Sequence, residues 1–321
     1  MRKIKGKSIL VTGGAGFIGS HLVDELITKG AGKIIVVDNF FLGKEENLQE
    51  AKKFRGFKLY REDATNYGVM ENIIDKENID VVFNLATKAL LHTFVDADDA
   101  YIVNVDIASV LLRLLHKSRY KTLIHFSSSE AYGTAKYVPI DENHPLFPET
   151  LYAAGKASAD LMVHSYHQTF GLDVATVRPF NTYGPRQNEG TYAAVIPITI
   201  KRILNKEKPV LEGDGNQTRD FTLVTEVVEA TIKTYENDKT VGKVINVASG
   251  KEAKIKDIIT TICKLLEYKG SWEKKPIRPA DVRRHLANIS LARKLLKYQP
   301  KVSLKIGLQE TVSWYVKKLK R

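Results

Sequence analysis

Four polar side chains near the middle of the chain could act together on an alcohol or a sugar hydroxyl. Ser128 and Glu130 lie in the stretch SSSEAYG, directly after the apolar run KTLIHF. Tyr152 and Lys156 follow in LYAAGK, at a spacing that puts both on one face of a helix. A tyrosine hydroxyl titrates at about pH 10, and a nearby ammonium stabilises the phenolate and lowers that pKa. Tyr152 is therefore expected to take a proton from the substrate, with Lys156 assisting it.

The run TLIHFSS is typical of a buried strand, and Ser128 and Glu130 are expected near its end. Alternate residues of a strand point to the same face, so these two side chains should point together into a cleft. Ser128 would then bridge the substrate oxygen and the tyrosine oxygen, and Glu130 would lie near the next one or two carbons. The alternative is that Glu130 is an exposed loop residue just past the strand.

A glycine-rich turn near the start of the chain predicts a dinucleotide site. In VTGGAGFIGSHL the glycines allow a tight turn and a close approach of the backbone to a pyrophosphate. The helix that follows offers free N–H groups and the positive end of its dipole. The residues expected here are Gly13, Gly16, Phe17, Ile18 and Gly19.

Residues at the ends of the next three expected strands complete this cofactor site. Asp38, followed by Asn39, ends the second strand, where its carboxylate can accept hydrogen bonds from both ribose hydroxyls. A carboxylate there repels a 2′-phosphate, which favours NAD over NADP; the alternative makes Asp38 a turn residue. Asp63 and Ala64 are expected to border the adenine, and Leu85 and Ala86 to line the pyrophosphate cleft.

The order of elements predicts an α/β fold. Short strands rich in β-branched residues alternate with amphipathic helices through the first half, which is typical of a Rossmann-type, doubly wound parallel sheet. Residues 1–184 are expected to form this NAD-binding domain, and the chain is expected to return to it after the second lobe begins. Residues 185–321, with shorter strands such as PVLEG and KVINVAS, are expected to form a smaller mixed α/β lobe that binds the substrate.

Composition narrows the class of protein. Hydrophobic residues make up 43% of the 321-residue chain, enough for a sizeable core. Cys263 is the single cysteine, so an intrachain disulfide and a cysteine-based metal cluster are excluded, and no metal site is expected. The net charge of +12 comes from scattered lysines, which argues against a nucleic-acid partner. With no signal peptide and no membrane-spanning run in the sequence, a cytoplasmic protein is expected.

Together these motifs resemble the extended short-chain dehydrogenase/reductase family, the NAD-dependent nucleotide-sugar epimerases and dehydratases. The resemblance extends through VRPFNTYGPRQ, GDGNQTRDF and RPADVRRH to the closing GLQETVSWY. It implies that Asn181 contacts the diphosphate and sugar, that Arg219 and Arg278 bind phosphates, and that Asp281 binds the nucleotide ribose. It also implies a homodimer, in which the helices around 98–118 and 152–170 form an intersubunit four-helix bundle.

The resemblance leaves the reaction open. Members of the family first oxidise C4 of the sugar. A 4,6-dehydratase then removes the C5 proton and eliminates the C6 hydroxyl, which needs a carboxylate where Glu130 is expected. A 4-epimerase needs none, and familiar 4-epimerases carry an uncharged residue at this position. We therefore predict a nucleotide-sugar 4,6-dehydratase, with a 4-epimerase as the alternative.

Two further functions fit the sequence less well. UDP-glucuronate decarboxylases share the Ser-Glu pair, but they carry an arginine downstream of GPR, where this chain reads QNEGTYAAV. A non-catalytic NAD-binding sensor should have lost the serine, the tyrosine or the lysine, and all are present. The chain also differs from dTDP-glucose dehydratases, which have an aspartate where Ser129 stands. Glu130 would therefore have to act both as the base at C5 and as the acid for the C6 oxygen. The nucleobase and the sugar cannot be read from the sequence.

Overall fold

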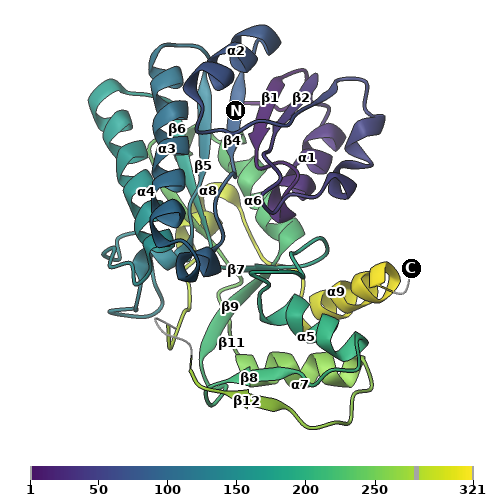
Figure 1. Ribbon diagram of the computed structural model, residues 1–321. Coiled ribbons are helices and arrows are strands. Elements are labelled where there is room, and N and C mark those ends of the chain that lie inside the picture. The colour runs from purple at the N-terminus through teal and green to yellow at the C-terminus, as the bar shows by residue number, and fades with distance from the viewer. Residues whose placement is uncertain (1, 278–281, 320–321) are drawn as a thin grey trace.

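The protein is described by a computed structural model that covers residues 2–277 and 282–319. It has a large α/β layer and, below it in Figure 1, a smaller part built from short strands and helices. The strands of the large layer form one seven-stranded sheet in the order β3-β2-β1-β4-β5-β6-β10. Every pair in this sheet is parallel. Its strands are β1 Ser8–Thr12, β2 Lys33–Val37, β3 Phe57–Tyr60, β4 Val81–Asn84, β5 Thr122–Phe126, β6 Val174–Pro179 and β10 Val244–Val247.

Helices cover both faces of the sheet, as the strand sequences require. In β1, Ile9 and Val11 belong to one core and Leu10 to the other, because successive side chains point to opposite faces. The first face is covered by α1 Phe17–Thr28, α6 Val224–Glu236 and α8 Ser290–Leu296. The second face is covered by α2 Tyr67–Glu77, α3 Ala97–His116 and α4 Leu151–Phe170. The predicted Rossmann-type sheet is therefore confirmed.

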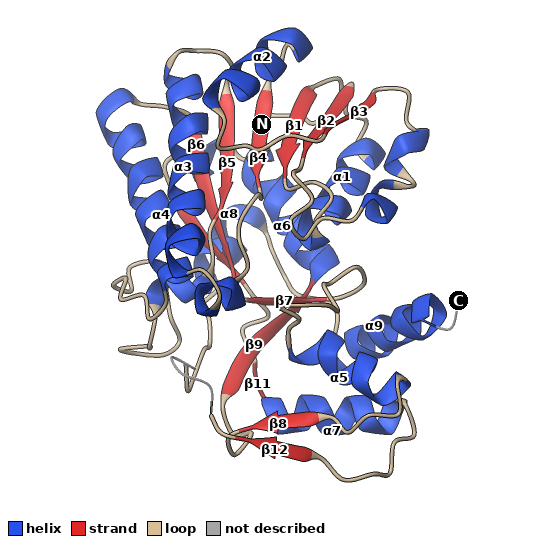
Figure 2. Ribbon diagram, in the orientation of Figure 1, coloured by secondary structure: helices blue, strands red, loops and turns tan. Residues whose placement is uncertain are grey.

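The smaller part has a core of its own. It combines a three-stranded sheet in the order β11-β9-β7, a two-stranded sheet of β12 and β8, and three helices (Figure 2). These elements are β7 Asn181–Tyr183, β8 Val210–Glu212, β9 Thr218–Leu223, β11 Glu252–Lys254, β12 Glu273–Lys275, α5 Val195–Leu204, α7 Ile255–Leu265 and α9 Leu304–Leu319.

The chain beyond residue 184 contributes to both parts. The segment KVINVAS, expected in the smaller lobe, supplies β10, which pairs with β6 at the edge of the large sheet. Helices α6 and α8 pack on the same sheet. In the part of the chain that the structure describes, no helix is both long and apolar enough to span a membrane.

Candidate active site

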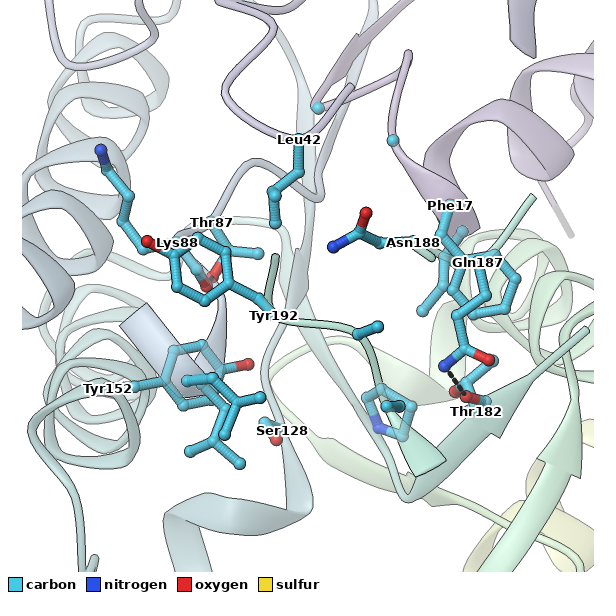
Figure 3. A pocket seen from close by; sticks show the side chains of 18 of the residues that line it. Phe17, Leu42, Thr87, Lys88, Ser128, Tyr152, Thr182, Gln187, Asn188 and Tyr192 are labelled. Carbon is cyan, nitrogen blue, oxygen red and sulfur yellow. Dashed lines mark hydrogen bonds between the residues drawn. The ribbon is translucent and has the colours of Figure 1, made fainter. Parts of the chain in front are cut away.

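A cavity of about 670 Å³ lies where the carboxyl ends of the parallel strands meet the smaller part. This is the usual place for a ligand in an open α/β sheet, because the loops there diverge. Figure 3 shows Tyr152 and Ser128 on one side of the cavity and Phe17, Gln187 and Thr182 on another. Both parts of the molecule therefore supply walls to one site.

The cavity brings together the residues singled out from the sequence wherever the structure describes them. Its lining includes Gly13, Gly16, Phe17, Ile18, Gly19, Asp38, Asn39, Asp63, Ala64, Leu85, Ala86, Ser128, Glu130, Tyr152, Lys156, Asn181 and Arg219. Arg278 and Asp281 lie outside the described residues. Their expected contacts with the nucleotide stay predictions.

The turn between β1 and α1 is shaped to receive a diphosphate. Gly13 has a φ of +68°, and a Cβ on it would lie 2.7 Å from the backbone nitrogen of Ala86. Gly16 is the N-cap of α1, and no side chain caps this end of the helix. Among the described residues, no side chain accepts from the N–H groups of the first turn, at Phe17 and Ile18, which stand at the cavity wall. A pyrophosphate fits this arrangement, since it can accept from these donors.

Asp38 is held rigidly at the end of β2. Its Oδ2 accepts a hydrogen bond from the backbone nitrogen of Ala15 at 2.9 Å, and its Oδ1 accepts from that of Phe40 at 2.8 Å. Burial raises the pKa of this carboxyl, and the two backbone donors oppose the rise. Nearby, the side chain of Asn39 donates to Asp63 at 2.8 Å. The adenosine end of the expected cofactor site therefore has a fixed acceptor, as a ribose requires.

Tyr152 and Lys156 lie in the first turns of α4, a helix that Thr150 caps by accepting from Ala153. The buried hydroxyl of Tyr152 is desolvated, and this raises its pKa to about 12; hydrogen bonding with Ser128 lowers it, and the charge of Glu130 raises it. Lys156 donates to the carbonyl oxygen of Phe126 at 3.0 Å, and burial lowers its pKa to about 8. Desolvation dominates the pKa of Tyr152 in this structure, and the expected lowering by Lys156 stays a prediction.

The strand argument for Ser128 and Glu130 is wrong. Strand β5 ends at Phe126, and residues Ser129–Tyr132 form a 3-10 helix, η4, with Ser128 as its N-cap. The Ser128 hydroxyl accepts from the backbone nitrogen of Glu130 at 3.2 Å. The two residues thus share the cavity wall through a helical cap rather than through strand alternation.

An aromatic and charged cluster at the cavity edge escaped the sequence reading. His92 bridges the hydroxyl of Tyr192 at 2.9 Å and the carboxylate of Asp99 at 2.8 Å. Lys88 pairs with Asp99 at 2.7 Å and lies 3.9 Å from the ring centroid of Phe41, which in turn stacks on Tyr192. Lys88, His92 and Asp99 lie within one stretch of the chain, but Phe41 and Tyr192 come from loops far away in sequence, so no local pattern indicates the cluster.

On the opposite side, β7 and β9 present the polar groups expected to meet a substrate. The side-chain oxygen of Asn181 is buried, and the described residues offer it no hydrogen-bond partner. Arg219 is nearly buried on β9 and donates to the carbonyl of Thr218 at 2.9 Å. An acceptor and a cation therefore face the cavity from the smaller part.

Comparison with known proteins decides the family. The protein family described as GDP-mannose 4,6 dehydratase matches residues 10–311. The chain belongs to this family. Within the extended short-chain dehydrogenases/reductases, it groups with NAD-dependent nucleotide-sugar epimerases, dehydratases and decarboxylases.

Similar family members carry different names. The chain is 34% identical to a UDP-glucuronate 4-epimerase of Thermodesulfobacterium geofontis, over 95% of each chain. It is 33% identical to a UDP-N-acetyl-alpha-D-glucosaminuronate decarboxylase of Bacillus cytotoxicus, over 96% of this chain and 98% of the relative. A dTDP-glucose 4,6-dehydratase from Streptomyces venezuelae, solved with NAD bound, superposes with a TM-score of 0.92 at 27% identity over 98% of both chains. Family membership thus leaves three reactions open.

Proposed function

We propose that this protein is an NAD-dependent nucleotide-sugar 4,6-dehydratase. The observation that carries the proposal is the carboxylate of Glu130 in the same cavity as Ser128 and Tyr152, near enough for its charge to raise the tyrosine pKa. A carboxylate there is costly to desolvate and unnecessary for oxidation at C4. It is suited to removing a proton from the carbon next to the one that is oxidised.

In the proposed first step, Tyr152 takes the proton of the C4 hydroxyl while the C4–H bond breaks. Ser128, which is hydrogen-bonded to Tyr152, orients the reacting oxygen. Lys156 supplies a positive charge beside the phenolate that forms. NAD, bound along the glycine turn and Asp38, would accept the hydride from C4 and later return it to C6.

In the proposed second step, Glu130 takes the C5 proton, which the new C4 carbonyl makes acidic. The electrons of the C5–H bond form a C5–C6 double bond as the C6–O bond breaks. The proton on Glu130 is available to the departing hydroxide, so water leaves and the carboxylate is restored. Hydride returned to C6 and a proton taken up from solvent at C5 would then complete the reaction, while Tyr152 loses to solvent the proton it took from the C4 hydroxyl. The residue before Glu130 is Ser129, so one carboxylate serves as both base and acid.

The proposed substrate is a nucleoside diphosphate sugar. Asn181 and Arg219 would hold its diphosphate and sugar, because an amide and a guanidinium suit hydroxyl and phosphate oxygens. A sugar carboxylate is less favoured. Two arginines of the cavity wall, Arg186 and Arg202, already pair with Asp24 at 2.7 Å and Glu273 at 2.9 Å.

A 4-epimerase is the second candidate, because relatives 31% and 34% identical to this chain bear that name. Incubation with UDP-glucose, UDP-N-acetylglucosamine, dTDP-glucose and GDP-mannose, with mass spectrometry of the products, separates the two. A dehydratase product is lighter by one water, whereas an epimerase product keeps the mass and changes its stereochemistry. Epimerised product without any water loss would overturn the proposal.

Replacing Glu130 tests its role directly. Glu130→Gln keeps the size and removes the base, so water elimination should slow about 10²–10⁴-fold. Reduced nicotinamide should still form on mixing with substrate, because Ser128, Tyr152 and Lys156 are untouched. The matched change Glu50→Gln, at an exposed residue paired with Lys53, should leave turnover unchanged. Full turnover by Glu130→Gln would favour epimerisation.

A further inference from the structure

A chain of buried polar side chains crosses the large sheet below the active-site helix. The Thr12 hydroxyl donates to Asn84 at 2.7 Å, and the Asn84 amide contacts His125 Nδ1 at 3.1 Å. His125 Nε2 lies 3.6 Å from Asp160 Oδ1. All four side chains are buried in β1, β4, β5 and α4. Burying so many polar groups is costly unless each is hydrogen-bonded. The burial of the charged side chain at the end of this row, Asp160, therefore needs an explanation.

Asp160 is the carboxylate nearest in sequence to Lys156 on α4. The two residues are one helical turn apart, and each is only 3% exposed. Asp160 Oδ2 accepts from the Ser127 hydroxyl at 2.6 Å and from Arg178 at 2.5 Å. His125 is neutral at working pH, since burial lowers its pKa to about 4. One buried carboxylate therefore pairs with the buried cation Arg178 and lies one helical turn from a second buried cation, Lys156.

We infer that Asp160 is a positioning residue whose negative charge keeps Lys156 protonated and sets the pH range in which Tyr152 and Lys156 work. The inference rests on the proposed alcohol-oxidising role of this pair. It does not depend on whether dehydration or epimerisation follows. Asp160 itself touches neither substrate nor reacting atoms in this scheme.

The negative charge of Asp160 raises the pKa of both Lys156 and Tyr152. Burial favours the uncharged amine of Lys156, and the attraction of Asp160 opposes that tendency. The same negative charge disfavours the phenolate of Tyr152. Removing one buried negative charge therefore lowers the pKa of both groups. A merely structural loss would reduce the amount of active enzyme without moving either pKa.

The other groups around Lys156 do not replace this charge. The titratable and charged groups in this region are Tyr152 on α4, Glu130 on η4, His125 on β5 and Arg178 on β6. Helix α3 presents the neutral Asn104 to Gly155, and the preceding 3-10 helix presents the hydroxyl of Thr93 to the start of α4. Glu130 lines the cavity, whereas Asp160 does not line it and accepts from Ser127, a residue of the cavity wall.

The test measures Lys156 directly in the NAD-loaded protein. Lysine labelled with ¹³C at Cε is followed by NMR during a pH titration, and the Lys156 signal is assigned by its loss in Lys156→Met. In Asp160→Asn the proton affinity of Lys156 should fall about tenfold or more, the effect of losing a close charge at low dielectric. Ser127→Ala removes a hydrogen bond to Asp160 without changing its charge and should leave the titration in place. An unchanged titration in Asp160→Asn would overturn the inference.

A kinetic readout complements the titration. With whichever sugar nucleotide reduces the bound cofactor, both limbs of the pH profile for reduced nicotinamide formation should move to lower pH in Asp160→Asn. Unmoved limbs with a smaller amplitude would assign Asp160 a structural role only. If Asp160→Asn does not fold, Asp160→Asn/Arg178→Met replaces both partners of the buried pair, a change that proteins tolerate better. Measured against Arg178→Met alone, a comparison that removes only the Asp160 charge, the same fall in Lys156 proton affinity is expected there. If no sugar nucleotide reacts, the proposed function fails and the NMR result still stands.

Discussion

At the residue scale, the position of the Asp38 carboxylate gives the most specific prediction about the cofactor. Its carboxylate is positioned by Ala15 and Phe40 before any ligand arrives, so it is ready to accept from ribose hydroxyls. A charge-assisted hydrogen bond is worth about 1.5–3 kcal/mol. Asp38→Ser should therefore weaken NAD binding roughly tenfold to a hundredfold and relax discrimination against NADP, as measured by calorimetry. The surface change Asp75→Asn is the control, and tighter binding of NADP than NAD by the unaltered protein would contradict the assignment.

Single residues also show how far sequence reasoning reaches. The Ser128–Glu130 pair was found by its types and its place after a strand, yet the strand periodicity used to orient it does not apply. Ser127 turns its hydroxyl to Asp160, and Ser128 caps η4, so the backbone leaves the sheet two residues early. Local patterns can identify such residues, but the contact of Ser127 with a helix 33 positions later cannot be read from them.

At the scale of elements, strand and helix types were predictable because β-branched runs and helical periodicity are local. Which sheet a strand joins depends on residues far away in sequence. For this reason β10 was assigned to the wrong part of the molecule. Its sequence, VINV, is as apolar as a central strand, but only the packing of α6 and α8 shows that it extends the large sheet. The cluster of Phe41, His92 and Tyr192 was missed for the same reason, since two loops and a 3-10 helix that are separate in sequence meet there.

One buried carboxylate joins elements from both parts of the molecule, and its loss should lower the free energy of unfolding. Asp220 on β9 accepts from the backbone nitrogen and hydroxyl of Ser249 through Oδ1, and from Gly250 and Ala287 through Oδ2. Asp220→Asn turns one acceptor into a donor facing other donors. Unfolding free energy should fall by about 3 kcal/mol, as measured by urea denaturation. Asp214→Asn, at an exposed ion pair with Arg283, should change it little, and equal stability of both variants would contradict this account.

At the scale of the whole molecule, α3 and α4 lie side by side on one face of the large sheet (Figure 2), and each carries an exposed apolar side chain. Ile102 is 49% exposed on α3 and Leu161 is 58% exposed on α4. Exposed apolar residues of this size on two packed helices are typical of an interface. We predict that the protein is a homodimer in which these two helices of each subunit form a four-helix bundle.

Sedimentation of the unaltered protein and of Ile102→Lys/Leu161→Lys tests the dimer. The unaltered protein should sediment as a dimer at micromolar concentration, and the double variant as a monomer with unchanged circular dichroism. Each chain carries a net charge of +12, so two subunits repel each other over distances that salt shortens. Association should therefore strengthen as salt rises from low ionic strength, which is expected when apolar contacts rather than ion pairs hold the interface. A monomer at every salt concentration would remove the predicted bundle, and a dimer that salt dissociates would place the interface on charged surface instead.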